Sequence, residues 1–198
     1  MVGHNVAVAE VHESEVIAGV QVVEPAVQAD DRGVFVETYR RSWFPGGLEM
    51  VQANRGDRRA GSLVGLHYHL HQADYWYVPE GRAQVVLHDL RAGSPTDGAT
   101  LSVDLGPGSD DGGDHRGLLI PPGVAHGFAA LTDVTITYLV DHYYNPADEL
   151  GVAWDDPEIA ADWGLEAPVL SARDQANPRR ADLPVEHRPH AGLRPGCR

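Results

Sequence analysis

An all-β fold, an antiparallel sandwich or barrel, is predicted for this chain by three features of its 198-residue sequence. Short runs of alternating or β-branched residues dominate, turn-forming residues separate them, and helical periodicity is nearly absent. With 42% hydrophobic residues, the chain is apolar enough and long enough to bury a core. We therefore expect one folded domain over residues 1–175, with only a few short helices.

The expected strands follow one another along most of the chain. They cover Val16–Val23, Val34–Tyr39, Leu63–Tyr68, Asp74–Val78, Ala83–His88, Ala99–Leu105, Gly117–Ile120 and Val134–His142. These runs are rich in β-branched and aromatic residues, which suit a half-buried pleated surface. Glycine, proline and aspartate favour turns, and they fill the intervals Asp30–Gly33, Pro79–Gly81, Gly93–Pro95 and Pro121–Gly123.

Helical signals are few, and the end of the chain differs in composition from the rest. Short helical turns are expected near Arg41–Phe44 and Pro157–Trp163, and a flexible surface loop over the acidic, glycine-rich Gly106–Asp114. From about Ser171 onward, prolines and arginines replace the apolar periodicity. We expect residues 176–198 to form an irregular or disordered tail.

The charge and composition of the chain argue against several partners and chemistries. A net charge of −14 argues against nucleic acid, because phosphate binding needs a basic surface. All 15 basic residues are arginine, so no lysine can form a Schiff base. The single cysteine, Cys197, excludes an intrachain disulfide and a thiolate metal site. Signal-peptide and membrane-span patterns are absent, so we expect a cytoplasmic protein without membrane contact.

Three histidines, His67, His69 and His71, alternate along one expected strand and its end. Side chains alternate faces in an extended strand, so these imidazoles are expected to share one face. Imidazole is a common metal ligand and also transfers protons near neutral pH. A solvated strand face or loop is the alternative. The later segment Pro121–His126, with its Pro-x-Gly-x-x-His spacing, favours a functional site.

Several long motifs occur in order between Val16 and Gln175. They are Asp31–Thr38, Val51–Asn54, Gly65–Tyr68, Asp89–Thr96, Ile120–Phe128, Tyr143–Tyr144 and Trp154–Pro157. Together they resemble the dTDP-4-dehydrorhamnose 3,5-epimerase family of the cupin superfamily. The resemblance implies a cupin double-stranded β-helix, or jelly roll, that usually forms a homodimer by exchanging N-terminal strands.

The resemblance also implies an activity in deoxysugar biosynthesis. Members invert carbons beside the C4 ketone of a dTDP-linked 4-keto-6-deoxy sugar, without a cofactor. A base removes a proton, a donor holds the enolate oxygen, and an acid returns a proton to the opposite face. By motif position, His67 is implied as the base, Asp174 as its partner and Tyr138 as the acid. The residues implied to bind the substrate are Arg32, Glu37, Gln52, Asn54, His126 and Tyr144.

Two departures from the family pattern leave this activity open. The family has an arginine immediately before Gly-Leu-His, where this chain has Val64, and a lysine on the next strand, where it has Asp74. Both cations are implied to hold the enolate, and losing one oxyanion donor typically costs about 10² to 10³ in rate. Arg55, Arg58 and Arg59 are candidates to replace them.

The same strands also resemble the general metal-binding pattern of cupins. That pattern is His-x-His, three or four intervening residues, an acid, six intervening residues, glycine, and later Pro-x-Gly-x-x-His. His67, His69, Asp74, Gly81 and His126 follow it, with aspartate in place of the usual glutamate. Three imidazoles and one carboxylate suit a divalent transition metal such as zinc, iron, manganese, nickel or copper. An ion pair between Asp74 and a protonated histidine is the alternative.

Three functions therefore remain open at the level of the sequence. The first is an epimerase or related isomerase of a nucleotide-linked sugar that uses no cofactor. The second is a metal-dependent cupin enzyme, an oxygenase or isomerase, in which the metal prevents His67 from acting as a base. The third is a catalytically silent cupin that binds a sugar nucleotide. Resemblance along nearly the whole folded part favours the first.

Overall fold

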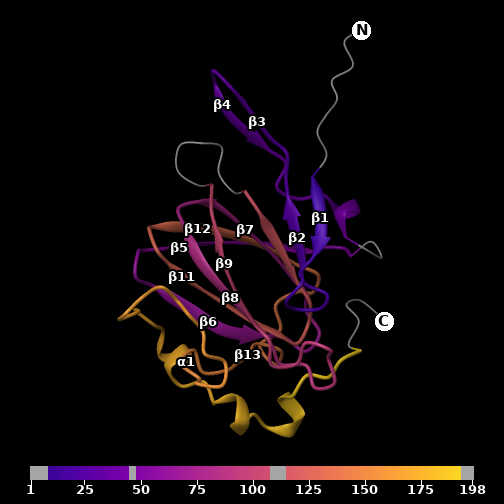
Figure 1. Ribbon diagram of the computed structural model, residues 1–198, viewed down its shortest axis with the longest axis vertical. Coiled ribbons are helices and arrows are strands. Elements are labelled where there is room, and N and C mark those ends of the chain that lie inside the picture. The colour runs from indigo at the N-terminus through magenta and orange to yellow at the C-terminus, as the bar shows by residue number, and fades with distance from the viewer. Residues whose placement is uncertain (1–8, 45–47, 108–114, 193–198) are drawn as a thin grey trace.

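Two antiparallel sheets face each other in the computed structural model, which describes residues 9–44, 48–107 and 115–192 (Figure 1). The larger sheet contains, in spatial order, β1 (Glu10–Glu13), β2 (Gln21–Glu24), β10 (Gly117–Ile120), β7 (Asp74–Glu80), β12 (Val134–Val140) and β5 (Gln52–Arg58). The smaller sheet contains β13 (Leu150–Gly151), β6 (Leu63–Tyr68), β11 (Val124–Ala130), β8 (Ala83–Asp89) and β9 (Thr100–Leu105). This architecture confirms the predicted all-β fold.

A separate hairpin of β3 (Val27–Asp30) and β4 (Gly33–Val36) projects from the body of the protein (Figure 1). Sequence analysis predicted one longer strand over Val34–Tyr39. The strand is shorter because β4 follows the turn at residues 31–32 and pairs with β3 only as far as Val36. The side chains of Val34 and Phe35 are 56% and 68% exposed, so the hairpin presents apolar surface to its surroundings.

Two of the expected strands, Leu63–Tyr68 and Gly117–Ile120, have the predicted bounds. The first expected strand instead begins late, at Gln21. The hydroxyl of Ser14 accepts hydrogen bonds from the amides of Val16 and Ile17, at 3.1 and 3.3 Å, and Gly19 adopts a φ of 80°. These contacts bend the chain, so the apolar residues before β2 form a turn.

The helices differ in part from the prediction. The expected turn near Arg41–Phe44 is the 3-10 helix η1 (Arg41–Trp43). The expected helix at Pro157–Trp163 is wrong, because the Asp156 carboxylate accepts from the Glu158 amide at 2.9 Å and holds a turn there. The short helix α1 (Ala172–Gln175) was not predicted. Most of the expected loop at Gly106–Asp114 lies outside the described residues.

The two sheets are held together by a core between their inner faces. It includes Ile17, Val20, Trp76, Val85, Leu87, Leu118, Phe128 and Ile136. The strands β6 and β11 approach closely, since a Cβ on Gly65 would lie 2.6 Å from the Cα of Gly127. This close approach requires glycine at both positions, and it fixes β6 beside β11 where both strands carry histidines.

A second apolar cluster covers the outer face of the smaller sheet. Residues of that sheet, such as Leu63 and Tyr68, contact Ile159, Trp163 and Leu183 from the C-terminal part of the chain. The C-terminal segment contains η3 (Arg180–Asp182) and η4 (Val185–His187), and the hydroxyl of Tyr68 donates to the carbonyl of His187 at 2.9 Å. The described part of the expected tail is therefore irregular but packed on the barrel. No described helix has the length and apolar character required to cross a membrane.

Candidate active site

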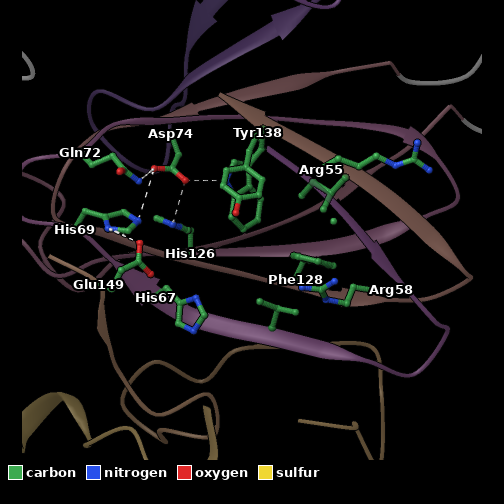
Figure 2. A pocket seen from close by; sticks show the side chains of 14 residues that line it. Arg55, Arg58, His67, His69, Gln72, Asp74, His126, Phe128, Tyr138 and Glu149 are labelled. Carbon is green, nitrogen blue, oxygen red and sulfur yellow. Dashed lines mark hydrogen bonds and ion pairs between the residues drawn. The ribbon is translucent and has the colours of Figure 1, made fainter. Parts of the chain in front are cut away.

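A cavity of about 140 Å³ lies between the two sheets (Figure 2). Its walls come from β5, β6, β7, β11 and β12 and from the loops that follow β6 and precede β13. The polar and charged lining residues are Arg55, Arg58, His67, His69, Gln72, Asp74, His126, Tyr138 and Glu149; Val64, Trp76, Phe128 and Ile136 line the apolar part. The cavity thus brings together His67 and Tyr138, expected to transfer protons, and the residues expected to bind a metal.

His67 on β6 is paired with the carboxylate of Asp174. Its Nε2 lies 2.6 Å from Oδ1 of Asp174, which confirms the predicted contact. Ser171 caps α1 by accepting from the Asp174 amide at 3.1 Å, and its hydroxyl donates to Oδ2 of Asp174 at 2.9 Å. Burial alone would raise the pKa of Asp174, but hydrogen bonds to His67 and Ser171 outweigh it and lower that pKa. The ionised carboxylate therefore holds the Nε2–H of His67 and leaves Nδ1 as the basic nitrogen.

Tyr138 reaches the cavity from β12, on the opposite sheet from His67. Burial, together with the carboxylates of Asp74 and Glu149, raises the pKa of Tyr138, while the charge of Arg58 acts in the other direction. The phenol consequently carries its proton at neutral pH. A protonated phenol and an imidazole base on opposite walls suit removal of a proton from one face and its return to the other.

His69, Asp74 and His126 form a second group in the cavity. The Nε2 of His69 lies 3.7 Å from Oδ1 of Asp74, and the Nε2 of His126 lies 3.8 Å from Oδ2. Burial lowers the pKa of His126 to about 4, although the nearby Asp74 opposes this shift. In the described part of the chain, the ligand atoms of these three residues lie within 4.8 Å of one another. His67 is outside this group, so the four-residue metal set expected from the cupin pattern is not assembled.

His71 does not share the face of the other histidines. The strand β6 ends at Tyr68, and the carboxylate of Asp148 then accepts from the amides of Leu70 and His71, at 2.7 and 3.1 Å. These bonds turn the chain and leave His71 exposed. The alternating pattern was therefore wrong for this histidine, because a residue distant in sequence ends the strand.

Two of the three arginines considered as replacement cations line the cavity, namely Arg55 and Arg58. Both also contact Asp57. Arg55 forms an ion pair with its carboxylate at 3.0 Å, and Arg58 donates to its backbone carbonyl at 2.8 Å. Arg59 is not among the lining residues. The positive charge of Arg58 acts to lower the pKa of Tyr138. A cation is therefore present on this side of the cavity.

Of the six residues expected to bind the substrate, His126 lines the cavity, and the other five lie in two places outside its lining. Gln52, Asn54 and Tyr144 lie together. The Nε2 of Gln52 donates to Asn54 at 2.9 Å, and its Oε1 accepts from the Tyr144 amide at 3.2 Å. Arg32 instead lies on the projecting hairpin, paired with Asp30 at 2.6 Å. Glu37 follows that hairpin and pairs with Arg40 at 2.7 Å. Within one chain, neither Arg32 nor Glu37 lines the cavity.

Sequence reasoning missed several polar residues of the site. Gln72 and Trp76 donate to the Asp74 carboxylate, at 2.9 and 3.2 Å, from two positions before and after it. Trp76 shares a face of β7 with Asp74, and this signal was available in the sequence, whereas Gln72 lies in the loop before the strand. Glu149 and Asp148 lie beside His69 only because of the fold. Nothing in their local sequence indicates this position.

The chain is similar to known proteins over most of its length. Residues 14–182 match the sequence pattern of the dTDP-4-dehydrorhamnose 3,5-epimerase family. The chain is 38% identical over 168 residues to the dTDP-4-dehydrorhamnose 3,5-epimerase of Neisseria gonorrhoeae, a match that covers 79% of this chain and 48% of that protein. The chain therefore spans about half the length of this curated relative.

Solved structures match over nearly their whole length. NovW, a 4-keto-6-deoxy sugar epimerase from Streptomyces spheroides, has a TM-score of 0.85 and 33% identity, covering 94% of this chain and 96% of that chain. RmlC of Legionella pneumophila, solved in complex with dTDP-4-keto-L-rhamnose, has a TM-score of 0.83 and 31% identity, covering 92% of this chain and 98% of that chain. The similarity includes the fold and the sequence together.

Proposed function

The chain belongs to the dTDP-4-dehydrorhamnose 3,5-epimerase family, and from this we propose that it epimerises a dTDP-linked 4-keto-6-deoxy sugar in deoxysugar biosynthesis. One observation carries the proposal. His67 is held by Asp174 on one wall of the cavity, and Tyr138 lines the same cavity from the opposite sheet. A base and an acid on opposite sides of a substrate are what inversion at carbon requires.

In the proposed reaction, His67 takes the proton from the carbon beside the ketone. The C–H bond breaks, its electron pair moves into the enolate, and the proton joins Nδ1 of the ring. The imidazolium that forms is stabilised by the Asp174 carboxylate at Nε2. Because the hydrogen bonds of Asp174 lower its pKa, it remains ionised when His67 becomes charged. This charge pairing favours proton removal.

Tyr138 then supplies the proton to the other face of the same carbon. Its raised pKa keeps the phenol protonated until the enolate forms. The cavity wall that carries Tyr138 also carries Gly56 and Ile136, which leave space and apolar surface next to the sugar. A water-excluding surface of this kind limits protonation by solvent from the wrong face.

We further propose that the nucleotide binds beside Gln52, Asn54 and Tyr144, and that Arg32 and Glu37 come from a second subunit. The hairpin of β3 and β4 projects from the body of the protein, which supports this arrangement (Figure 1). It carries the exposed Phe35, and Arg32 in its turn does not line the cavity of its own chain. A homodimer would cover the exposed apolar residues. An arginine can hold phosphate oxygens through two parallel hydrogen bonds.

The single cysteine and the acidic net charge of −14 support a cytoplasmic enzyme with a small-molecule substrate.

Solvent exchange tests this proposal directly. The protein is incubated in D₂O with dTDP-4-keto-6-deoxyglucose, and NMR follows deuterium entering the carbons beside the ketone and the appearance of the inverted sugar. We expect both events with the wild type and neither with His67→Gln. Tyr138→Phe should still exchange deuterium through His67 but give little inverted product, because its acid is missing. Tyr39→Phe, in an aromatic cluster with Phe44 and Tyr75, is the matched control. Exchange by the wild type no faster than the spontaneous rate would overturn the proposal.

A further inference from the structure

Three buried side chains converge on one point in the cavity, from β7, β11 and the loop after β6 (Figure 2). His69, Asp74 and His126 are only 5%, 2% and 4% exposed. Each histidine faces a different oxygen of the carboxylate, at 3.7 Å for His69 and 3.8 Å for His126. These separations exceed the 2.7–3.2 Å range of an N–H···O hydrogen bond, so the three groups do not bond directly to one another.

The backbone fixes which nitrogen of each ring carries the hydrogen. Nδ1 of His69 lies 2.8 Å from the carbonyl of Asp148, and Nδ1 of His126 lies 2.9 Å from the carbonyl of Val124. A carbonyl only accepts, so both Nδ1 atoms must donate. In the neutral rings, the Nε2 lone pairs therefore point at the Asp74 carboxylate. Two lone pairs and an anion that face one point repel one another unless a cation lies between them.

The surroundings of Asp74 complete the arrangement. Gln72 and Trp76 donate to its two oxygens at 2.9 and 3.2 Å, which fixes the plane of the carboxylate. Metal-binding histidines typically donate their other ring nitrogen to a carbonyl or carboxylate, and metal-binding carboxylates are themselves hydrogen-bonded. Both features are present here. A shared proton would instead draw its two partners to about 2.7–2.9 Å, which neither histidine shows.

We propose that His69, Asp74 and His126 bind one divalent transition-metal ion through two imidazole nitrogens and a carboxylate. Such an ion sits about 2.0–2.2 Å from each ligand atom, a distance that a small inward movement of the three side chains provides. Three protein ligands leave coordination positions open toward the cavity. Sites with open positions bind substrate or water, whereas structural zinc sites are filled by four protein ligands.

The ion has a chemical role that rests on the epimerase function proposed above. The cavity contains the carboxylates of Asp74 and Glu149, and both disfavour an enolate that develops nearby. A divalent ion on Asp74 reverses this local charge and accepts the ketone oxygen as a ligand. Bound there, the ion would supply positive charge to the ketone oxygen as the C–H bond breaks, and the reaction would involve no net gain or loss of electrons. His67 stays available as the base, because Asp174 holds it outside the metal group.

Metal binding is measured first without any substrate. Protein stripped with chelator is titrated with Co²⁺ and Zn²⁺ by calorimetry, and Co²⁺ is also followed by its visible absorption. We expect one ion per chain, and cobalt bands typical of four or five ligands. His69→Gln and Asp74→Asn should each weaken binding by at least about 100-fold. Circular dichroism establishes whether each variant is folded. If Asp74→Asn does not fold, the test of the site rests on His69→Gln, in which glutamine is similar in size to histidine.

His71→Gln is the matched control, because His71 lies two residues from His69 but is exposed. It should bind as the wild type does. Failure of the wild type to bind Co²⁺, Zn²⁺, Fe²⁺, Ni²⁺ or Mn²⁺, or equal binding by folded His69→Gln, overturns the site. Deuterium exchange is then compared for stripped and loaded protein. If the protein binds one ion but catalyses no deuterium exchange, the metal site is supported and the epimerase function is refuted. If stripped and loaded protein exchange deuterium at the same rate, the ion has no catalytic role.

Discussion

The carboxylate of Asp174 lies 2.6 Å from the imidazole of His67, across 107 positions of sequence. The contact exists because Ser171 caps the short helix α1 and thereby presents Asp174 to the inner strand β6. Asp174 is only 3% exposed, although it belongs to a segment that is poor in apolar residues. A C-terminal element outside the two sheets thus completes the proton-transfer pair of the barrel.

Asp174→Asn tests what this contact contributes to the reaction. Asparagine keeps the size of the side chain but cannot stabilise an imidazolium, so we expect kcat to fall by about 10²- to 10⁴-fold. The measurement is kcat and KM for epimerisation, and KM should change little because the substituted group does not touch the nucleotide. Asp182→Asn, an exposed acid on the following turn, is the control and should act as the wild type. A loss of less than tenfold would assign Asp174 to stability alone.

The sequence predicted those parts of the fold and site that depend on local pattern. Leu63–Tyr68 is a short, mainly apolar run and forms β6 as predicted. The strand β5 was missed because Gln52–Arg58 is polar and charged, and it is a strand because it pairs along its whole length with β12. Asp174 was predicted as the partner of His67 from motif resemblance alone, because no local spacing links the two residues. The turn at His71 depends on Asp148, which only the folded chain brings near.

A second prediction concerns stability in acid and the buried residue Asp89. Burial opposes ionisation, but hydrogen bonds from Arg91, Ser94 and Thr96 outweigh it and lower the pKa of Asp89 to about 2. The folded pKa is below the ordinary value of 3.8, so this stabilisation is complete above about pH 4 and is lost as the pH falls toward 2. It amounts to about 2 kcal/mol of unfolding free energy.

Urea unfolding at several pH values checks this prediction. Between pH 4 and pH 2, the wild type should lose more stability than Asp89→Asn, because the variant has no carboxylate to protonate. The variant should also be less stable at neutral pH, since its amide cannot pair with Arg91. Asp133→Asn is a control on the surface. Identical pH dependence of the wild type and Asp89→Asn would contradict the assigned role.

The proposed dimer gives a third prediction. Phe35 is 68% exposed on the projecting hairpin, and a second subunit would cover it. Phe35→Glu should shift the protein from dimer to monomer in size-exclusion chromatography with light scattering. It should also weaken dTDP binding, because Arg32 on the same hairpin would no longer reach a partner. Val185→Glu places the same charge at a residue that is 75% exposed elsewhere, and it should remain dimeric. A wild type that is monomeric at all concentrations would exclude this arrangement.

The last prediction concerns a double variant, Asp74→Lys with Val64→Arg, in which side-chain cations replace the proposed metal ion. Asp74→Lys removes the carboxylate from between His69 and His126 and puts an ammonium there, which repels a divalent ion. Val64→Arg adds a second positive charge on the β6 wall of the cavity. We expect the double variant to take up no Co²⁺ and to catalyse deuterium exchange at a rate that chelators do not change, because fixed cations now hold the enolate oxygen.

Val64→Arg alone provides the control for this exchange of charges. Val64 is apolar and does not belong to the metal group, so the single variant, which keeps all three ligands, should still take up one Co²⁺ and should lose activity when the ion is removed. Calorimetry with Co²⁺ and NMR in D₂O give the two measurements. Uptake of Co²⁺ by the double variant with unchanged affinity would show that the ion binds elsewhere. A folded double variant whose exchange still requires added metal would show that the ion does more than hold charge at the ketone oxygen.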